Sequence, residues 1–162
     1  MTNSLTETPT PKAMTSGCGL NIKKILVAVD LSAHSAETAA YAAALAEAFG
    51  AHLTLLHVCS PNGATEETGS KDCRFNDPVI TPEKELENLA KKIRRTYPEC
   101  SAYVCAGDPA DKIVMMAEIL RADLILTGSR HPSFLGQLLG LDQPARIAHR
   151  APCPVLVYHT GA

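Results

Sequence analysis

The sequence predicts an α/β fold, a three-layer sandwich in which helices cover both faces of a five-stranded parallel sheet. Two observations lead to this prediction. From residue 22 onward, unbroken apolar segments of strand length alternate with longer segments of helical periodicity, and unbroken apolar strands are typical of parallel sheets buried on both faces. The length of 162 residues also suits one domain with its own core. Alternation of this kind favours parallel strands joined by right-handed helical crossovers.

The first strand and helix are the clearest elements. "KKILVAVD", residues 23–30, is the first predicted strand, and the alanine-rich stretch after it predicts a helix whose small side chains pack closely on a sheet. Ser32 or Ser35 is available as the N-cap of this helix, and Gly50 is placed to end it. "HLTLLHV", residues 52–58, is the second predicted strand.

The next two helices begin with the same signature, a capping residue followed by proline: Thr81–Pro82 and Asp108–Pro109. Apolar residues in both follow the helical spacing i, i+3, i+4 and i+7. They are Leu86, Leu89, Ala90 and Ile93 in the first of the two helices, and Ile113, Met116, Ala117 and Leu120 in the second. The remaining predicted elements are strands at 101–106, 122–128 and 154–159 and a short helix over Gln143–Arg150.

Two segments lie outside this alternation. Residues 1–21 are rich in Thr, Ser and Pro and are expected to form a flexible tail before a domain of residues 22–162. Residues 59–81 are longer than an ordinary structureless loop. This long loop either folds over a site at the carboxyl end of the second strand or is a tolerated surface insertion.

Composition argues against several classes of function. The formal net charge is −2, which gives no overall field to attract nucleic acid or an acidic membrane. The basic run at 91–95 is expected to be a solvated helix face. No signal peptide and no membrane span can be recognised in the sequence, so a cytoplasmic protein is expected.

The six cysteines are expected to be reduced thiols, because no export signal accompanies them. Cys105 and Cys153 should be buried and unreactive, whereas Cys18 and Cys73 should be exposed. No C-x-x-C occurs and the histidines are scattered, so no metal site is predicted.

Ligands of parallel α/β sheets bind outside the carboxyl ends of the strands. The predicted strand ends place Val29, Asp30, Val58 and the loop after Thr127 at this edge. Asp30 has two readings that remain open: it caps the first helix, or it accepts a hydrogen bond from a ligand.

Four motifs occur in a fixed order. They are V-D-x-S at 29–32, G-x-P-x-x-x-I at 107–113, A-D-L-I-L-T-G-S at 122–129 and A-P-C-P-V-L-V at 151–157. With them, residues 22–159 resemble the universal stress protein family. The resemblance implies a Rossmann-like domain of the adenine nucleotide alpha hydrolase-like type, usually dimeric, that acts in stress responses without an established reaction. Some members bind ATP or AMP and others do not.

Nucleotide-binding members carry G-x2-G-x9-G-S/T after the fourth strand. Counted from Gly128 without a gap, the later positions hold His131, Leu141 and Asp142. Leu141 blocks the close approach of a phosphate that glycine permits, and the Asp142 carboxylate repels it. A one-residue deletion would instead bring Gly140 into register. We favour the ungapped reading, which predicts a degenerate loop with weak or no ATP binding.

The resemblance also implies that Ala28, Asp30, Val58 and Thr127 line the place of adenine and ribose. A modified loop that still holds AMP or ATP would use Gly128, Arg130, His131, Gly140 and Asp142. Two functions therefore stay open: a stress protein that acts through protein contacts without a triphosphate site, and an adenine nucleotide-binding stress protein.

An enzyme is a third and weaker reading. Ser129, Arg130 and His131 are adjacent along the chain without a visible orienting group, so no catalytic residue is predicted. The apolar last strand would leave an open sheet edge, which predicts a homodimer that pairs through Val155 and Val157.

Overall fold

Strands and helices alternate along the parts of the chain that the computed structural model describes, residues 20–60, 81–129 and 143–159. The elements are β1 (Lys24–Val29), α1 (Ser35–Phe49), β2 (His52–Cys59), α2 (Pro82–Arg94), β3 (Cys100–Ala106), α3 (Pro109–Leu120), β4 (Leu124–Ser129), α5 (Gln143–Arg150) and β5 (Val155–His159). The predicted α/β class is confirmed, as are the five strands.

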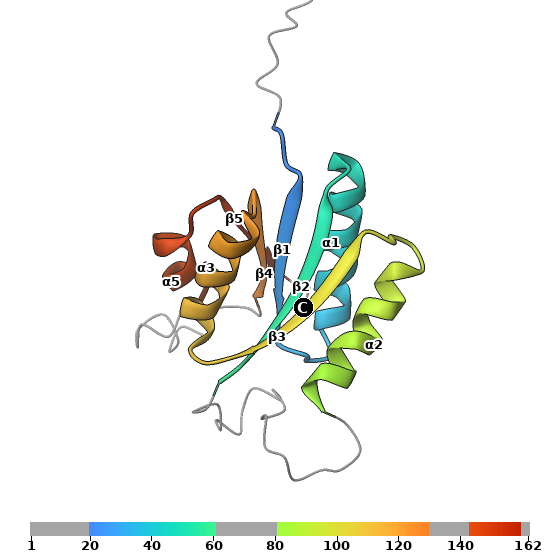
Figure 1. Cartoon of the computed structure of the whole chain (residues 1–162), viewed down its shortest axis with the longest axis horizontal. Coiled ribbons are helices and arrows are strands. Elements are labelled where there is room, and N and C mark those ends of the chain that lie inside the picture. The colour runs from blue at the N-terminus through green and yellow to red at the C-terminus, as the bar shows by residue number, and fades with distance from the viewer. Residues whose placement is uncertain (1–19, 61–80, 130–142, 160–162) are drawn as a thin grey trace, which may run out of the picture.

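The five strands form one parallel sheet in the order β3-β2-β1-β4-β5. The chain runs outward from β1 to β3 and then returns to place β4 on the other side of β1 (Figure 1). The order therefore reverses between β1 and β4. Such a switch point is where sheets of this kind form a crevice for ligands.

Helices cover both faces of the sheet, with α1 and α2 on one side and α3 and α5 on the other (Figure 1). Each side has its own apolar cluster, and side chains along a strand alternate between the two. In β1, for example, Ile25 and Val27 belong to the α1/α2 cluster, and Leu26 belongs to the α3/α5 cluster. The three-layer arrangement is thus confirmed.

Most predicted helix ends are confirmed. Thr81 and Asp108 cap α2 and α3, each followed by its proline, and Gly50 ends α1 with a left-handed φ of 61°. The predicted cap of α1 was wrong. His34 is the N-cap residue and makes no side-chain cap bond, whereas the hydroxyl of Ser35 donates to the carboxylate of Asp30, the residue after β1.

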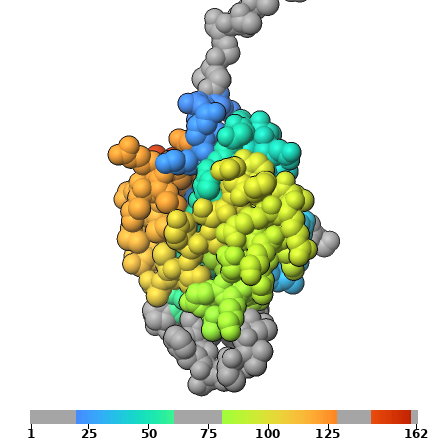
Figure 2. Space-filling view, turned by 45° about the vertical axis from the view of Figure 1, so that its right-hand side comes forward, coloured from blue at the N-terminus to red at the C-terminus, as the bar shows by residue number. Residues whose placement is uncertain are grey.

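The predicted apolar stripes face the core. All four stripe residues of α2 are buried, and so are those of α3 except Leu120, which is half-buried. On the α3 side, the edge strand β3 is incompletely covered. Tyr103 on β3 is 46% exposed, and the yellow atoms of β3 form part of the surface in Figure 2.

The thiols differ from the prediction in two ways. Cys105 and Cys153 are half-buried, and Cys100 is the fully buried thiol among the free cysteines of the described residues. Burial raises the pKa of the Cys100 and Cys153 thiols, which favours the unreactive form. Cys59 is disulfide-bonded, so the prediction that all six thiols are reduced was wrong.

Several predictions fall outside the described residues. These are most of the tail, most of the 59–81 loop, and the exposure of Cys18 and Cys73. Within the described ranges, Cys59 is the last residue of β2 and Thr81 caps α2. No helix there is long and apolar enough to cross a membrane, and no cluster of His, Cys, Asp and Glu could hold a metal ion.

Candidate functional site

The carboxyl ends of β1 and β4 bring predicted site residues together. Ala28 and Thr127 are register partners on these two strands. Both side chains alternate onto the α3/α5 face, as does Val58 on β2. Ala28 and Val58 are half-buried, whereas Thr127 is 4% exposed. Three of the predicted residues, Ala28, Val58 and Thr127, thus line the same face of the sheet at the switch point. We call this group of residues the β1/β4 junction.

Thr127 contributes a polar atom that the described part of the chain leaves without a partner. Its hydroxyl oxygen is buried and makes no hydrogen bond, and the same holds for Oε1 of Gln143 at the start of α5. An unsatisfied buried polar group typically costs about 1–3 kcal/mol. Strand β4 and helix α5 come directly before and after residues 130–142 in the chain, so both atoms lie on the described elements that border this segment.

Asp30 organises the turn that leaves β1. Its Oδ1 accepts hydrogen bonds from the backbone N–H of Ser32 at 3.0 Å and from the hydroxyl of Ser35 at 2.8 Å. Between them, Leu31 has a φ of 59°, a conformation uncommon for residues other than glycine. Asp30 therefore has a structural role at the start of α1, and its role toward a ligand stays a prediction.

Val29 lies on a different side from the other predicted residues. Its side chain is buried in the α1/α2 cluster, away from Ala28 and Thr127. Its carbonyl accepts a hydrogen bond from Nδ1 of His57 at 2.9 Å, and His57 is only 3% exposed. From the sequence, His57 was predicted only to be a strand residue. The hydrogen bond by which its imidazole joins β2 to the end of β1 has no signal in the sequence.

Gly128 has a packing role that the sequence did not reveal. A Cβ on Gly128 would lie 2.8 Å from Oγ1 of Thr38 on α1, and Thr38 is 3% exposed. Glycine at this position therefore lets α1 approach the end of β4. This reason for the glycine is independent of any phosphate.

A charged pair joins α5 to the start of α3. The guanidinium of Arg146 donates to both carboxylate oxygens of Asp108, at 3.1 and 3.3 Å, and Asp108 also accepts the backbone N–H of Asp111 as the cap of α3. The backbone N–H of Asp111, together with Arg146, lowers the pKa of Asp108. Sequence reasoning missed Arg146, because its partner is 38 residues away.

The predicted phosphate contacts cannot be placed. Arg130, His131, Gly140, Leu141 and Asp142 lie outside the described residues. The structure thus brings together the predicted adenosine side of the site and leaves the loop side as a prediction.

Strand β5 pairs only with β4, so within the described residues no strand lies on its other edge. Val155 and Val157 are half-buried within the chain. On the α1 side of β5, the ring of Tyr158 stacks on Tyr41 with centroids 4.4 Å apart, and its hydroxyl donates to Glu37 at 3.1 Å. These contacts fix the strand in place, while the pairing of β5 with a second subunit stays a prediction.

Comparison with known proteins identifies the family. Residues 21–159 match the Universal stress protein family. The chain belongs to the universal stress protein family. A universal stress protein of Thermus aquaticus, encoded in the QAH/OAS sulfhydrylase 3′ region, is 33% identical over 141 residues, which cover 83% of this chain and 97% of the relative.

Solved universal stress protein structures share the fold. A universal stress protein in complex with cAMP superimposes with a TM-score of 0.68 and 23% identity, covering 87% of this chain and 99% of that one. A universal stress protein from Archaeoglobus fulgidus in complex with dAMP has a TM-score of 0.58 and 23% identity, covering 85% of this chain and 98% of that one. The predicted family and the Rossmann-like fold are confirmed.

Proposed function

We propose that this universal stress protein is a non-enzymatic, cytoplasmic stress-response protein that binds an adenine nucleoside monophosphate at the β1/β4 junction. The observation that carries the proposal is the hydroxyl of Thr127, which is buried at the switch point of the sheet without a partner among the described residues. A nucleoside would give this hydroxyl a hydrogen bond.

The surroundings of Thr127 suit the base and sugar of a nucleoside. Ala28 and Val58 present small, half-buried apolar surface on the same face, and nucleotide sites combine apolar walls with few polar groups that set orientation. The cAMP and dAMP complexes of two proteins of the same fold support an adenine nucleotide as the ligand class.

The sequence of the loop supports a monophosphate over a triphosphate. On the ungapped reading of the loop, Leu141 and Asp142 take the positions where nucleotide-binding members of the family carry glycine and Ser or Thr. Two like charges about 4 Å apart repel by roughly 1 kcal/mol in water and several times more near a protein surface. Each added phosphate raises this repulsion, so ATP should bind weakly or not at all.

We further propose that the protein works as a homodimer joined through β5 and acts through contacts with other proteins. The open edge of β5 supports this assembly, because an unpaired edge strand readily pairs with another strand. The half-buried side chains of Val155 and Val157 would be covered further in such a pair.

Titration calorimetry of the full chain with AMP, cAMP and ATP tests the proposal. We expect AMP to bind with at least tenfold higher affinity than ATP, a difference of about 1.4 kcal/mol. Absence of binding by all three would favour a stress protein that acts through protein contacts alone. Tighter binding of ATP than AMP would show that the modified loop holds a triphosphate.

A further inference from the structure

A second pocket lies at the opposite end of the sheet from the β1/β4 junction. It has a volume of about 120 Å³ and is formed where β1, β2 and β3 begin, beside the carboxyl end of α3. Its lining residues are Lys24, Ile25, Leu26, His52, Thr54, Ser101, Tyr103, Leu120 and Ala122. We call it the amino-end pocket. It lies on the face where β3 is incompletely covered, and β3 (yellow) is at the surface in Figure 2.

A buried hydroxyl lines the amino-end pocket. Thr54 is 6% exposed, and its neighbours Leu53 and Leu55 point to the opposite face of the sheet. No hydrogen bond joins the Thr54 hydroxyl to another described residue, and the atom is not among the fully buried ones without a partner. The hydroxyl therefore reaches the open space of the pocket, where it can meet a polar group of a ligand.

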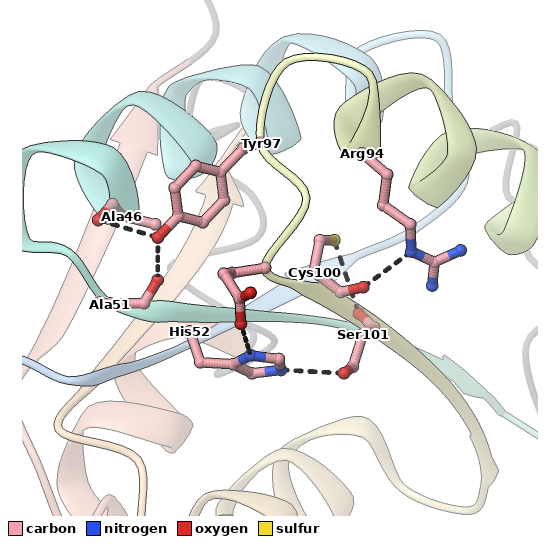
Figure 3. Close-up of polar contacts among 8 residues, drawn as sticks. Ala46, Ala51, His52, Arg94, Tyr97, Cys100 and Ser101 are labelled. Atoms are coloured by element: carbon pink, nitrogen blue, oxygen red, sulfur yellow. Dashed lines mark hydrogen bonds and ion pairs between the residues drawn. The ribbon is translucent and has the colours of Figure 1, made fainter.

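The imidazole of His52 and the hydroxyl of Ser101 form the outer polar end of the pocket. Nε2 of His52 lies 2.9 Å from Oγ of Ser101 (Figure 3). Nδ1 of the same ring lies 3.7 Å from a carboxylate oxygen of Glu99, which is not among the lining residues. When Nε2 carries the proton it donates to Ser101, and the hydroxyl of Ser101 can donate in turn to a ligand.

Lys24 places a positive charge at the pocket. Its ammonium donates to the carbonyl of Leu120 at 3.1 Å, which uses one of three N–H donors. The nearby Asp123 carboxylate accepts the backbone N–H groups of Lys23 and Lys24 and is not among the lining residues. The lining therefore contains basic and hydroxyl groups, with no acidic side chain.

The rest of the lining is apolar and limits the size of a ligand. Leu26, Leu120, Ala122 and the ring of Tyr103 contribute apolar surface to the lining. An apolar cavity of about 150 Å³ can hold benzene, and each water takes about 30 Å³ of liquid volume. A pocket of about 120 Å³ is smaller than that cavity, so a molecule the size of benzoate would fill it and project in part toward solvent.

We propose that the amino-end pocket binds a small organic carboxylate with a compact apolar body. The carboxylate lies among Lys24, Thr54 and Ser101, and the apolar body lies against Leu120 and Tyr103. This site is separate from the β1/β4 junction and does not depend on nucleotide binding.

An NMR titration of the ¹⁵N-labelled full chain with sodium benzoate tests the proposal, with benzyl alcohol as the uncharged control. We expect saturable shifts of the amides of Lys24, Thr54 and Ser101, and weaker shifts with the alcohol. Thr54→Val and Lys24→Met should each lower the benzoate affinity about fivefold, the effect of one lost hydrogen bond. Thr54→Ser and Lys24→Arg should retain most of it.

Thr127→Val is the matched control, because Thr127 is an equally buried threonine on the same face at the other end of the sheet. It should leave benzoate affinity unchanged. The proposal is overturned if shifts do not saturate, if the alcohol binds as well as benzoate, or if the shifts occur only at the β1/β4 junction. An AMP titration of the same sample reports on the proposed function separately.

Discussion

Thr127 on β4 and Ala28 on β1 are register partners at the point where the strand order of the sheet reverses. The pair combines a small, half-buried side chain with a buried hydroxyl that lacks a hydrogen bond within the described structure. A buried hydroxyl without a hydrogen bond lowers the free energy of unfolding. We therefore propose that this pair belongs to a binding site, as set out for AMP above.

Thr127→Val separates binding from stability. The substitution keeps the shape of the side chain and removes the unsatisfied hydroxyl, so the free energy of unfolding should stay the same or rise. AMP affinity should fall about fivefold, because one hydrogen bond to the ligand is lost. Calorimetry and urea unfolding measure the two effects, and Thr54→Val should leave AMP affinity unchanged. A variant that is less stable and binds AMP normally would refute the role given to Thr127.

Gly128→Ala should destabilise the fold through a steric clash with α1. The new Cβ would lie 2.8 Å from Oγ1 of Thr38, and overpacking of this kind typically costs about 1–3 kcal/mol. Thr38→Ala removes the opposing atoms, so the double variant should be more stable than the sum of the single effects predicts. Urea unfolding of the four proteins measures the coupling. If the changes in the free energy of unfolding of the two single variants simply add, the new Cβ at position 128 does not clash with Thr38.

Asp108→Asn should change the pH dependence of stability. The folded-state pKa of Asp108 lies below its usual value of 3.8, chiefly because the backbone N–H of Asp111 donates to it and further because of Arg146. The ionised carboxylate thus stabilises the fold above about pH 3.8, and this contribution is lost as the pH falls through the folded pKa. Asparagine keeps the cap and removes the charge.

The effect should be small, because the Asp108 and Arg146 side chains are 40% and 42% exposed and solvent screens the pair. At pH 7 we expect the variant to be less stable by under about 1 kcal/mol, with the difference closing at acid pH. Urea unfolding at both pH values measures it, and Glu47→Gln on the exposed end of α1 is the control. A difference that persists below the folded pKa would assign the loss to the cap geometry.

The β5 edge should form the dimer interface. Light scattering at tens of micromolar should report a dimer for the wild type. Val157→Arg places a charge on the half-buried edge strand and should give a folded monomer. Tyr103→Arg, on the opposite edge strand β3, should remain dimeric. A wild-type monomer, or loss of the dimer in the Tyr103 variant alone, would contradict pairing through β5.

Local signals in the sequence predicted the fold well. Proline after Thr81 and after Asp108 located two helix starts, and Gly50 located a helix end. The cap of α1 was mispredicted; in the structure the carboxylate of Asp30 accepts the hydroxyl of Ser35 and the backbone N–H of Ser32. Capping preferences alone could not predict that Asp30 would accept these hydrogen bonds.

The site was predictable only in part, because its remaining contacts are long-range. The strand-end rule pointed to Val29, Val58 and the loop after Thr127, and the family resemblance added Ala28. Neither could show that Val29 points to the opposite face of the sheet. The approach of Thr38 to Gly128 and the pair between Arg146 and Asp108 join segments distant in the chain. No spacing in the sequence encodes these contacts.

The most direct test of the central claim is an AMP titration of the ¹⁵N-labelled wild-type protein, followed by NMR. We predict saturable shifts concentrated at the amides of Ala28, Asp30, Val58 and Thr127, with the amino-end residues His52 and Ser101 unchanged. ATP at the same concentrations should cause smaller shifts. No saturable shift at the β1/β4 junction, or saturation only at the amino end of the sheet, would contradict the account.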